Sequence, residues 1–438
     1  MGVFSFVTGK SRSPCGAINI ASPAFKANPF PFYARLRAEA PAYRTTLPTK
    51  EIAWLITRYD DVVTVLKDER FVKNTSNALT QEQAANQRWF RKLFKPLKRN
   101  LLDLDPPDHT RLRALVYKAF TPRLIEQMRE RIQKLTNELL DAVQDRGSLD
   151  LIQEYALPLP TTIIAEMLGV PIEDRHRFHR WSNALMAAAA SSWEMMKAVP
   201  SAWALMRYLR KLIKMRRADP KNDLVSALAR AEEAGDKMSE DELLAMVFLL
   251  LVAGHETTVN LIGNGTLALL EHPDQMGRLR TDPGLIKPAL EEILRYAGPA
   301  EMATERYARQ DVTIAGATIP RGEMVFAVLA SANRDERQFP NSDALDITRE
   351  PNRHLAFGLG THFCLGASLA RLEGQIAINT LLRRLPDLRL VVAPETLRWR
   401  RGLILRGLES LPVAFGKAGG TSGGQDVAGT AFTAVRPD

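Results

Sequence analysis

Residues 357–366 read FGLGTHFCLG and are the most informative ten residues of the chain. They place Cys364, one of only two cysteines, in a glycine-rich loop directly before an apolar, helix-like run, ASLARLEGQIAINTLL. Backbone N–H groups and the helix dipole at such a position favour a thiolate, which can act as a nucleophile or as a metal ligand. The alternative is that Cys364 is simply a small buried hydrophobic side chain, the usual fate of a free cysteine.

The remaining composition indicates a large intracellular protein. The chain has 438 residues, and Cys15 and Cys364 form neither a disulfide framework nor a zinc motif. No signal peptide is evident at the N-terminus. The longest apolar run, 243–254, is too short to cross a bilayer. We therefore expect a cytoplasmic protein without a transmembrane anchor, because reduced cysteines suit that compartment.

The chain is basic, with a formal net charge of +9 and a pI of about 9.5. This balance admits an acidic partner, an anionic substrate, nucleic acid or a membrane surface, and does not choose among them. Residues 88–99 interleave basic and aromatic residues, a pattern that can contact phosphates, lipid headgroups or an anionic substrate. A solvated amphipathic turn broken by Pro96 explains the same pattern.

The hydrophobic periodicity predicts a mainly helical fold with a smaller β portion. A strand is expected at 53–57, a helix at 59–67 and several strands within 306–329. Residues 1–21 look like a flexible leader, 22–416 like the globular domain and the glycine-rich 417–438 like a disordered tail. The Trp- and Met-rich stretch 181–208 is either core or an adaptable roof over a lipophilic pocket, with a break between two helices at Pro200.

A long helix is predicted from Ser239 to about Leu270. Ser239 and Glu242 form a capping box at its start. Its middle reads AGHETT, residues 253–258, and the polar pair Glu256-Thr257 is costly inside an apolar helix unless it is used. The local opening could hold a small ligand or water. The alternative is a satisfied buried threonine beside a glutamate at the surface.

Two further motifs are weak when taken alone. HTRLR, residues 109–113, puts His109 and Arg113 one turn apart on one helical face, which suits a carboxylate or phosphate but also an ordinary surface helix. EEILR, residues 291–295, contains the i, i+3 pair Glu292 and Arg295.

The four motifs together, in this order, resemble those of the cytochrome P450 family in its soluble bacterial form. FGLGTHFCLG matches the family pattern F-x-x-G-x-H/R-x-C-x-G at every defined position, and the resemblance extends from Pro23 to Phe415. It implies one catalytic domain with haem between the long central helix and the cysteine loop and helix. The segment before the haem loop departs from the family, with Ser342 and Leu345 where proline and phenylalanine are frequent.

The resemblance also implies roles for individual residues. Cys364 would be the axial thiolate ligand of the iron of haem b, with Phe357 and Gly358 shaping its loop. The haem propionates would be held by a set of basic side chains, namely His109, Arg113, Arg306 and His362. Ala253 and Gly254 would lie over the haem face, and Glu256 and Thr257 would be the acid–alcohol pair that delivers protons for O–O cleavage.

The remaining implied residues form the substrate pocket and a structural network. The pocket would be lined by Leu249, Val252, Ala253 and Met302, with parts of 73–100 and 181–208. Glu292, Arg295 and Arg349 would form a structural Glu-Arg-Arg network.

The expected function is haem-thiolate monooxygenation, in which one oxygen atom of O2 enters a lipophilic small molecule by hydroxylation or epoxidation. Electrons would come from NAD(P)H through a ferredoxin reductase and a ferredoxin, because the chain has no flavin or iron–sulfur motif. We expect a monomer that binds no nucleic acid. The alternatives are a peroxide-driven peroxygenase, which usually lacks the acid–alcohol pair, and a non-enzymatic haem-binding sensor, which needs Cys364 but neither Glu256 nor Thr257.

Overall fold

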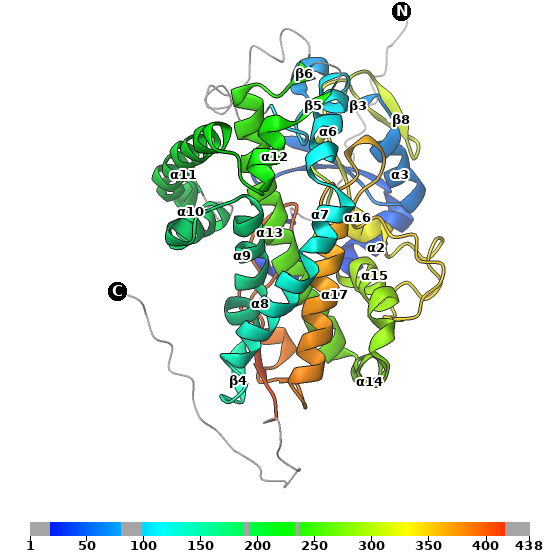
Figure 1. Cartoon of the computed structure of the whole chain (residues 1–438). Coiled ribbons are helices and arrows are strands. Elements are labelled where there is room, and N and C mark those ends of the chain that lie inside the picture. Colours follow the sequence, from blue (N-terminus) through cyan, green and yellow to red (C-terminus); the bar gives the residue numbers. More distant parts are fainter. Residues whose placement is uncertain (1–17, 80–98, 188–191, 234–235, 417–438) are drawn as a thin grey trace, which may run out of the picture.

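The computed structural model describes residues 18–79, 99–187, 192–233 and 236–416, and within them the protein is mainly helical with a smaller β portion (Figure 1). The predicted fold class is therefore confirmed. The basic segment 88–99, apart from its last residue, and the tail 417–438 lie outside the described residues. Of the predicted leader, residues 18–21 are described, and Ile20 is buried in the core.

The helices follow one another closely along the chain. They are α1 (Pro23–Ala27), α2 (Phe30–Glu39), α3 (Tyr59–Lys67), α6 (Asp108–Ala119), α7 (Pro122–Gln127), α8 (Arg129–Asp141), α9 (Pro158–Met167), α10 (Arg175–Ala187), α11 (Ser192–Ala218), α12 (Leu224–Arg230), α13 (Glu240–Glu271), α14 (Pro273–Thr281), α15 (Ile286–Ala297), α16 (Leu329–Ala332) and α17 (Ala367–Arg384). The predicted helix at 59–67 is α3, with the same bounds.

The main sheet has five strands in the order β1-β2-β10-β7-β3, and only the pair β2–β10 is parallel. A second sheet has the order β11-β12-β4, and β5–β6 and β8–β9 are separate antiparallel pairs. The main sheet lies on the opposite side of α13 from α10 and α11 (Figure 1). The strands are β1 (Ala42–Thr46), β2 (Ile52–Ile56), β3 (Phe71–Val72), β4 (Ser148–Asp150), β5 (Glu232–Glu233), β6 (Asp236–Lys237), β7 (Arg306–Ala308), β8 (Val312–Ile314), β9 (Ala317–Ile319), β10 (Met324–Ala327), β11 (Arg389–Leu390) and β12 (Pro412–Ala414).

Helix α13 runs through the middle of the molecule, in contact with α9, α15 and α17 (Figure 1). The predicted capping box starts it: the Ser239 amide donates to Glu242 Oε2 at 2.9 Å, and the Glu242 amide donates to Ser239 Oγ at 3.2 Å. By length and hydropathy α13 is the one helix of the described residues that passes as a membrane span, yet 56% of its most apolar window is buried inside the protein. We therefore interpret α13 as a core helix of the protein.

Helix α11 corrects one expectation, because it continues through Pro200 where a break between two helices was predicted. Proline removes one helical hydrogen bond, and the carbonyl left without it belongs to Met196. Met196 is exposed, so water can satisfy that carbonyl. The buried face, which includes Ala198, Leu205 and Leu209, holds the helix against the core. Tertiary packing therefore overrides the local signal of the proline.

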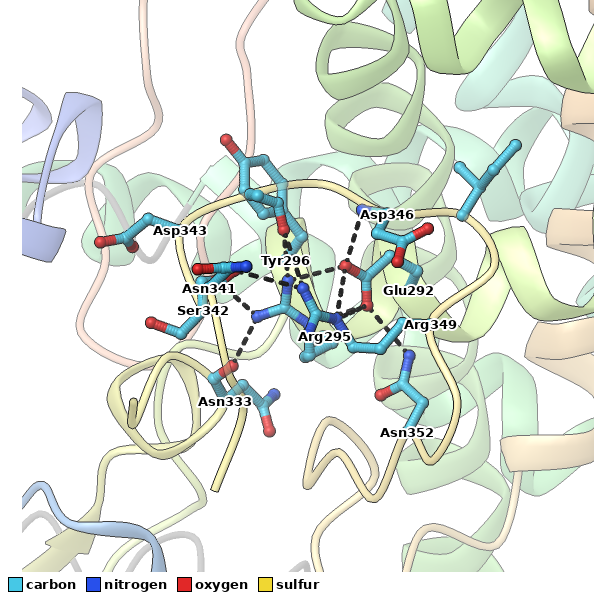
Figure 2. Close-up of polar contacts among 12 residues, drawn as sticks. Glu292, Arg295, Tyr296, Asn333, Asn341, Ser342, Asp343, Asp346, Arg349 and Asn352 are labelled. Carbon is cyan, nitrogen blue, oxygen red and sulfur yellow. Dashed lines mark hydrogen bonds and ion pairs between the residues drawn. The ribbon is translucent and has the colours of Figure 1, made fainter. Parts of the chain in front are cut away.

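A buried ionic network fixes the segment that leads into the cysteine loop (Figure 2). Arg295 donates from Nε and Nη2 to the Glu292 carboxylate at 2.7 Å each, and Arg349 Nε donates to the same carboxylate at 3.1 Å. Arg295 also donates to the carbonyls of Ser342 and Ala344. These contacts use backbone oxygens, so the unusual side chains at 342 and 345 leave the network intact.

Candidate active site

Cys364 sits in a tight loop that ends where α17 begins. The Cys364 amide donates to the Phe357 carbonyl at 2.9 Å and closes the loop. Gly358 and Gly360 have φ values of +68° and +73°, a region that side chains disfavour. A Cβ atom at Gly360 would approach the Leu66 carbonyl oxygen to 2.9 Å, so glycine also permits the contact with α3. The glycines thus present Cys364 at the N-terminal end of α17.

Cys364 is partly open to solvent, although protein surrounds its sulfur closely. Burial raises the pKa of its thiol, and hydrogen bonds from the amides of Gly366 and Ala367 act in the opposite direction, as do the nearby charges of Arg113 and Arg371. Hydrogen bonds from these two amides to the sulfur stabilise a thiolate. A metal cation bound to the sulfur would outweigh the effect of burial, because a thiol that coordinates a metal loses its proton.

Arg113 supports the cysteine loop from α6. Its guanidinium donates to the carbonyls of Thr361 and Phe363 at 2.9 and 2.8 Å, and to the Tyr117 hydroxyl at 2.8 Å. These contacts give Arg113 a bracing role in addition to the propionate contact, which stays a prediction.

Three of the predicted propionate ligands come together from distant parts of the chain. The rings of His109 on α6 and His362 lie 4.4 Å apart between centroids. His109 is fully buried, and neither of its ring nitrogens has a hydrogen-bond partner among the described residues. Arg306, at the start of β7, is also buried, and its Nε lacks a partner within the same described ranges. Buried polar atoms of this kind indicate a missing hydrogen-bonding group.

A fourth basic side chain of this cluster, Lys73, was missed by the sequence analysis. Its Nζ donates to the carbonyls of Thr304 and Glu305 at 3.1 and 2.9 Å, and it acts on His362 electrostatically. The only sequence signal was a lysine directly after a short apolar stretch, Phe71–Val72, and such a signal is too common to be informative.

The electrostatics of this cluster favour a bound anion. Burial lowers the pKa of His109 to about 4 and of His362 to about 2, with Arg113 and Arg306 respectively adding repulsion. Burial also lowers the pKa of Lys73 to about 7 and that of Arg306 to about 10. Because an anion would reverse these shifts and supply the missing acceptors, the donor set fits a group with two carboxylates, such as the propionates of haem.

The nearby carboxylate of Asp105 accepts hydrogen bonds from residues of the loop after β3. It accepts from the backbone amides of Lys73 and Asn74 at 2.7 and 3.0 Å and from Asn77 Nδ2 at 2.8 Å. Asp105 therefore holds the loop after β3. Its charge raises the pKa of His109 and Arg306, but burial outweighs this effect.

The predicted acid–alcohol pair lies on α13. Thr257 Oγ1 donates to the Ala253 carbonyl at 2.9 Å, which leaves its oxygen lone pairs able to accept another hydrogen bond. Burial raises the pKa of Glu256, and the charge of Arg400 partly offsets this effect. A carboxyl with a raised pKa carries its proton at higher pH than usual, which suits a proton donor.

The predicted pocket residues do not all share one environment. Val252 and Ala253 are exposed in the middle of a core helix, and Leu249 is half-buried. A Cβ atom at Gly254 would meet Ile164 of α9 at 3.4 Å. Met302 is completely buried in a cluster with side chains of α1, α2 and the main sheet, so the structure does not bring it to an open surface beside the α13 residues.

Glu373, a second residue missed by the sequence analysis, belongs to α17 and faces Thr258 of α13. It is buried, its Oε2 has no partner among the described residues, and its carboxyl is hydrogen-bonded to Thr258. Burial raises its pKa to about 8, so it is mostly neutral at pH 7. A helical pattern could have revealed it, because Glu373 shares a buried face with Leu369 and Ile376.

Replacing Glu373 by glutamine is expected to stabilise the protein at alkaline pH. The folded-state pKa of about 8 lies above the ordinary value of 4.5, so the parent protein loses stability as pH rises between these values. Glu373→Gln removes this titration and should raise the free energy of unfolding at pH 8 by about 4 kcal/mol, with little effect near pH 4.5. The measurement is the free energy of unfolding in urea, for parent and variant, between pH 4.5 and 8. Glu409→Gln makes the same change at an exposed position, and an equal gain there would refute the argument.

Comparison with known proteins agrees with this geometry. The family model "Cytochrome P450" matches residues 52–283 and 284–390. Polyketide biosynthesis cytochrome P450 PksS of Bacillus subtilis is 46% identical over 396 residues, which cover 90% of this chain and 97% of that protein. Cytochrome P450 monooxygenase PikC of Streptomyces venezuelae is 45% identical, with 89% of this chain and 91% of that protein covered.

A solved structure is similar in both fold and sequence. It is P450BioI in complex with an acyl carrier protein ligated to hexadec-9Z-enoic acid, with a TM-score of 0.82, 42% identity, and coverage of 90% of this chain and 100% of that chain. By its sequence, its fold and its cysteine loop, the chain belongs to the cytochrome P450 family and is a haem-dependent monooxygenase.

Proposed function

We propose that this enzyme binds haem b through Cys364 and inserts one oxygen atom of O2 into a lipophilic small molecule. The observation that carries the proposal is the convergence of the Cys364 loop with a buried cluster of basic groups, His109, His362 and Arg306, among which the His109 ring and Arg306 Nε have no partner in the described ranges. The cluster suits the propionates, and the thiol suits the iron. Bound there, haem with a thiolate ligand supplies the cleavage of the O–O bond.

The residues of α13 supply the protons that this reaction consumes. The Thr257 hydroxyl donates its proton to the Ala253 carbonyl, so its oxygen can accept a further hydrogen bond on the route of proton delivery. Glu256, with its raised pKa, passes protons inward from the solvent side. Neither residue is required by a haem-binding sensor, so their presence favours a monooxygenase.

Electrons come, in this proposal, from NAD(P)H through a reductase and a ferredoxin. The donor docks on the face nearest Cys364, where exposed Lys118 and Arg123 follow the Arg113 brace along α6 and α7. Opposite charges across such a contact accelerate association. The enzyme works as a monomer in the cytoplasm and without nucleic acid.

For the substrate we propose an acyl or polyketide chain, either as the free molecule or attached to a carrier protein. The similarity to a polyketide biosynthesis enzyme supports the first form. The similarity to an enzyme in complex with a ligated acyl carrier protein supports the second. The exposed apolar residues Val252 and Ala253 of α13 are compatible with a lipophilic chain in either form.

Replacing Thr257 by alanine tests the function. With NADPH, a ferredoxin system and a substrate selected by its effect on the haem spectrum, Thr257→Ala is expected to keep NADPH consumption but to divert most of it from product to hydrogen peroxide. The reason is that the variant loses a hydroxyl that accepts a hydrogen bond on the route by which protons reach the reacting oxygen. Product and peroxide formed per NADPH are the measurements.

Thr266→Ala is the matched control, because Thr266 is a buried threonine further along the same helix. It should leave product per NADPH unchanged. Unaltered coupling in Thr257→Ala would remove Thr257 from the mechanism. Equal product from hydrogen peroxide alone, without electron donors, would favour a peroxygenase.

A further inference from the structure

The outer face of α11 combines exposed apolar and basic side chains. Met196, Val199 and Trp203 are 67%, 55% and 66% exposed, which is unusual for large apolar residues on an ordered helix. They are spaced three and four residues apart and therefore form one stripe. The same stripe continues toward the C-terminus with the exposed residues Arg207, Arg210 and Lys214. We name these six residues the α11 outer face.

This helix also carries much of the positive charge of the protein. Residues 192–218 contain seven Lys or Arg and one Glu, a net of +6, against +9 for the whole chain. Arg207 lies over the Trp203 ring, 5.0 Å from its centroid. Within the described parts of the chain, no ion pair joins Arg210 or Lys214 to a carboxylate. These charges are therefore available to a partner.

We propose that the α11 outer face docks a small acidic carrier protein that presents the substrate chain to the enzyme. This inference rests on the proposed function, because it concerns the delivery of the same substrate. Tryptophan, methionine and arginine are the residues enriched at the centres of protein interfaces, and surrounding charges of opposite sign steer the partner. The face thus fits a partner with carboxylates around an apolar patch.

The arrangement fits a protein better than a lipid surface. A helix that lies in a membrane interface needs an apolar face along its length. On α11 the continuous apolar face, with Leu205, Leu209 and Leu212, is buried in the core, and the outer face is apolar only in its first half.

The location also suits substrate delivery. Helix α11 contacts α13, which carries Glu256 and Thr257, and lies at the outer edge of the molecule (Figure 1). Only α11 itself therefore separates a partner on the α11 outer face from α13, which carries the proposed pocket residues Val252 and Ala253.

The test is the affinity for a fluorescently labelled acyl carrier protein loaded with a hexadec-9Z-enoyl chain, measured by anisotropy with the haem-loaded enzyme. Trp203→Ala is expected to weaken binding about tenfold, since buried tryptophans dominate interfaces. The double variant Arg210→Glu, Lys214→Glu should weaken it at least about tenfold and reduce its salt dependence. The matched control Lys287→Glu, Arg389→Glu reverses two exposed charges on α15 and β11 and should bind like the parent.

Unchanged affinity in both α11 variants, or a loss only in the control, would overturn the docking site. Loss of binding to phosphatidylglycerol vesicles by the α11 variants, with unchanged affinity for the carrier protein, would assign the face to a membrane and equally overturn it. Oxidation of free hexadec-9Z-enoic acid by the same variants reports separately on the monooxygenase. Failure of docking and failure of the proposed function are thereby distinguished.

Discussion

Reduced protein under carbon monoxide is expected to show the strongly red-shifted Soret band of thiolate-ligated haem, and Cys364→Ser is expected to lose this band together with all monooxygenase activity. Serine has nearly the same shape but does not offer iron a thiolate. The loop should survive the change, because it is closed by the backbone contact between Cys364 and Phe357 and by Arg113. The absorption spectrum and product formation are the measurements.

Cys15→Ser provides the matched control, since it removes the other cysteine of the chain. It should retain both the band and the activity. A parent protein whose band lies at the position usual for histidine-ligated haem would contradict the assignment of Cys364. Loss of the band in Cys15→Ser alone would contradict it as well.

Glu292→Ala is expected to destabilise the fold by about 3–5 kcal/mol, the typical cost of breaking a buried ion pair. The Glu292 carboxylate is fully buried and accepts from Arg295, Arg349, Asn352 Nδ2 and the Asp346 amide (Figure 2). Without it, Arg295 remains charged and buried with only carbonyl partners. The free energy of unfolding in urea, at constant haem loading, measures the effect.

Glu291→Ala is the comparison for this prediction. Glu291 is the adjacent residue of α15, and it also pairs with an arginine, Arg371, and with His354. Burial would raise its pKa, but these two partners outweigh burial and hold it at about 2. Its side chain is 28% exposed, so water can replace the carboxylate and the cost should be clearly smaller. Equal losses in the two variants would show that burial of the network is not the source of its stability.

The sequence predicted those parts of the protein that depend on neighbours along the chain. The capping box at Ser239, the bounds of α3 and the glycine turns of the Cys364 loop depend on residues close in sequence, so local patterns identify them. The family could likewise be recognised, because its motifs are short and contiguous.

Other features needed the tertiary structure. The continuity of α11 through Pro200 depends on packing against the core, which the local pattern does not contain. Met302 was expected to line the substrate pocket, and only the structure shows that its side chain packs with α1, α2 and the main sheet; its pocket role stays a prediction. The neutral carboxyl of Glu373 arises only because α13 packs against α17.

The sequence by itself therefore determined the cysteine loop, the central helix with its polar pair, and the class of chemistry. The tertiary structure alone decided how these parts form a site. It brings Lys73, His109, Arg306 and His362 together from four segments, and their shifted pKa values exist only in that arrangement. The physical reason is that burial and charge repulsion depend on distances in space, while sequence patterns report distances along the chain.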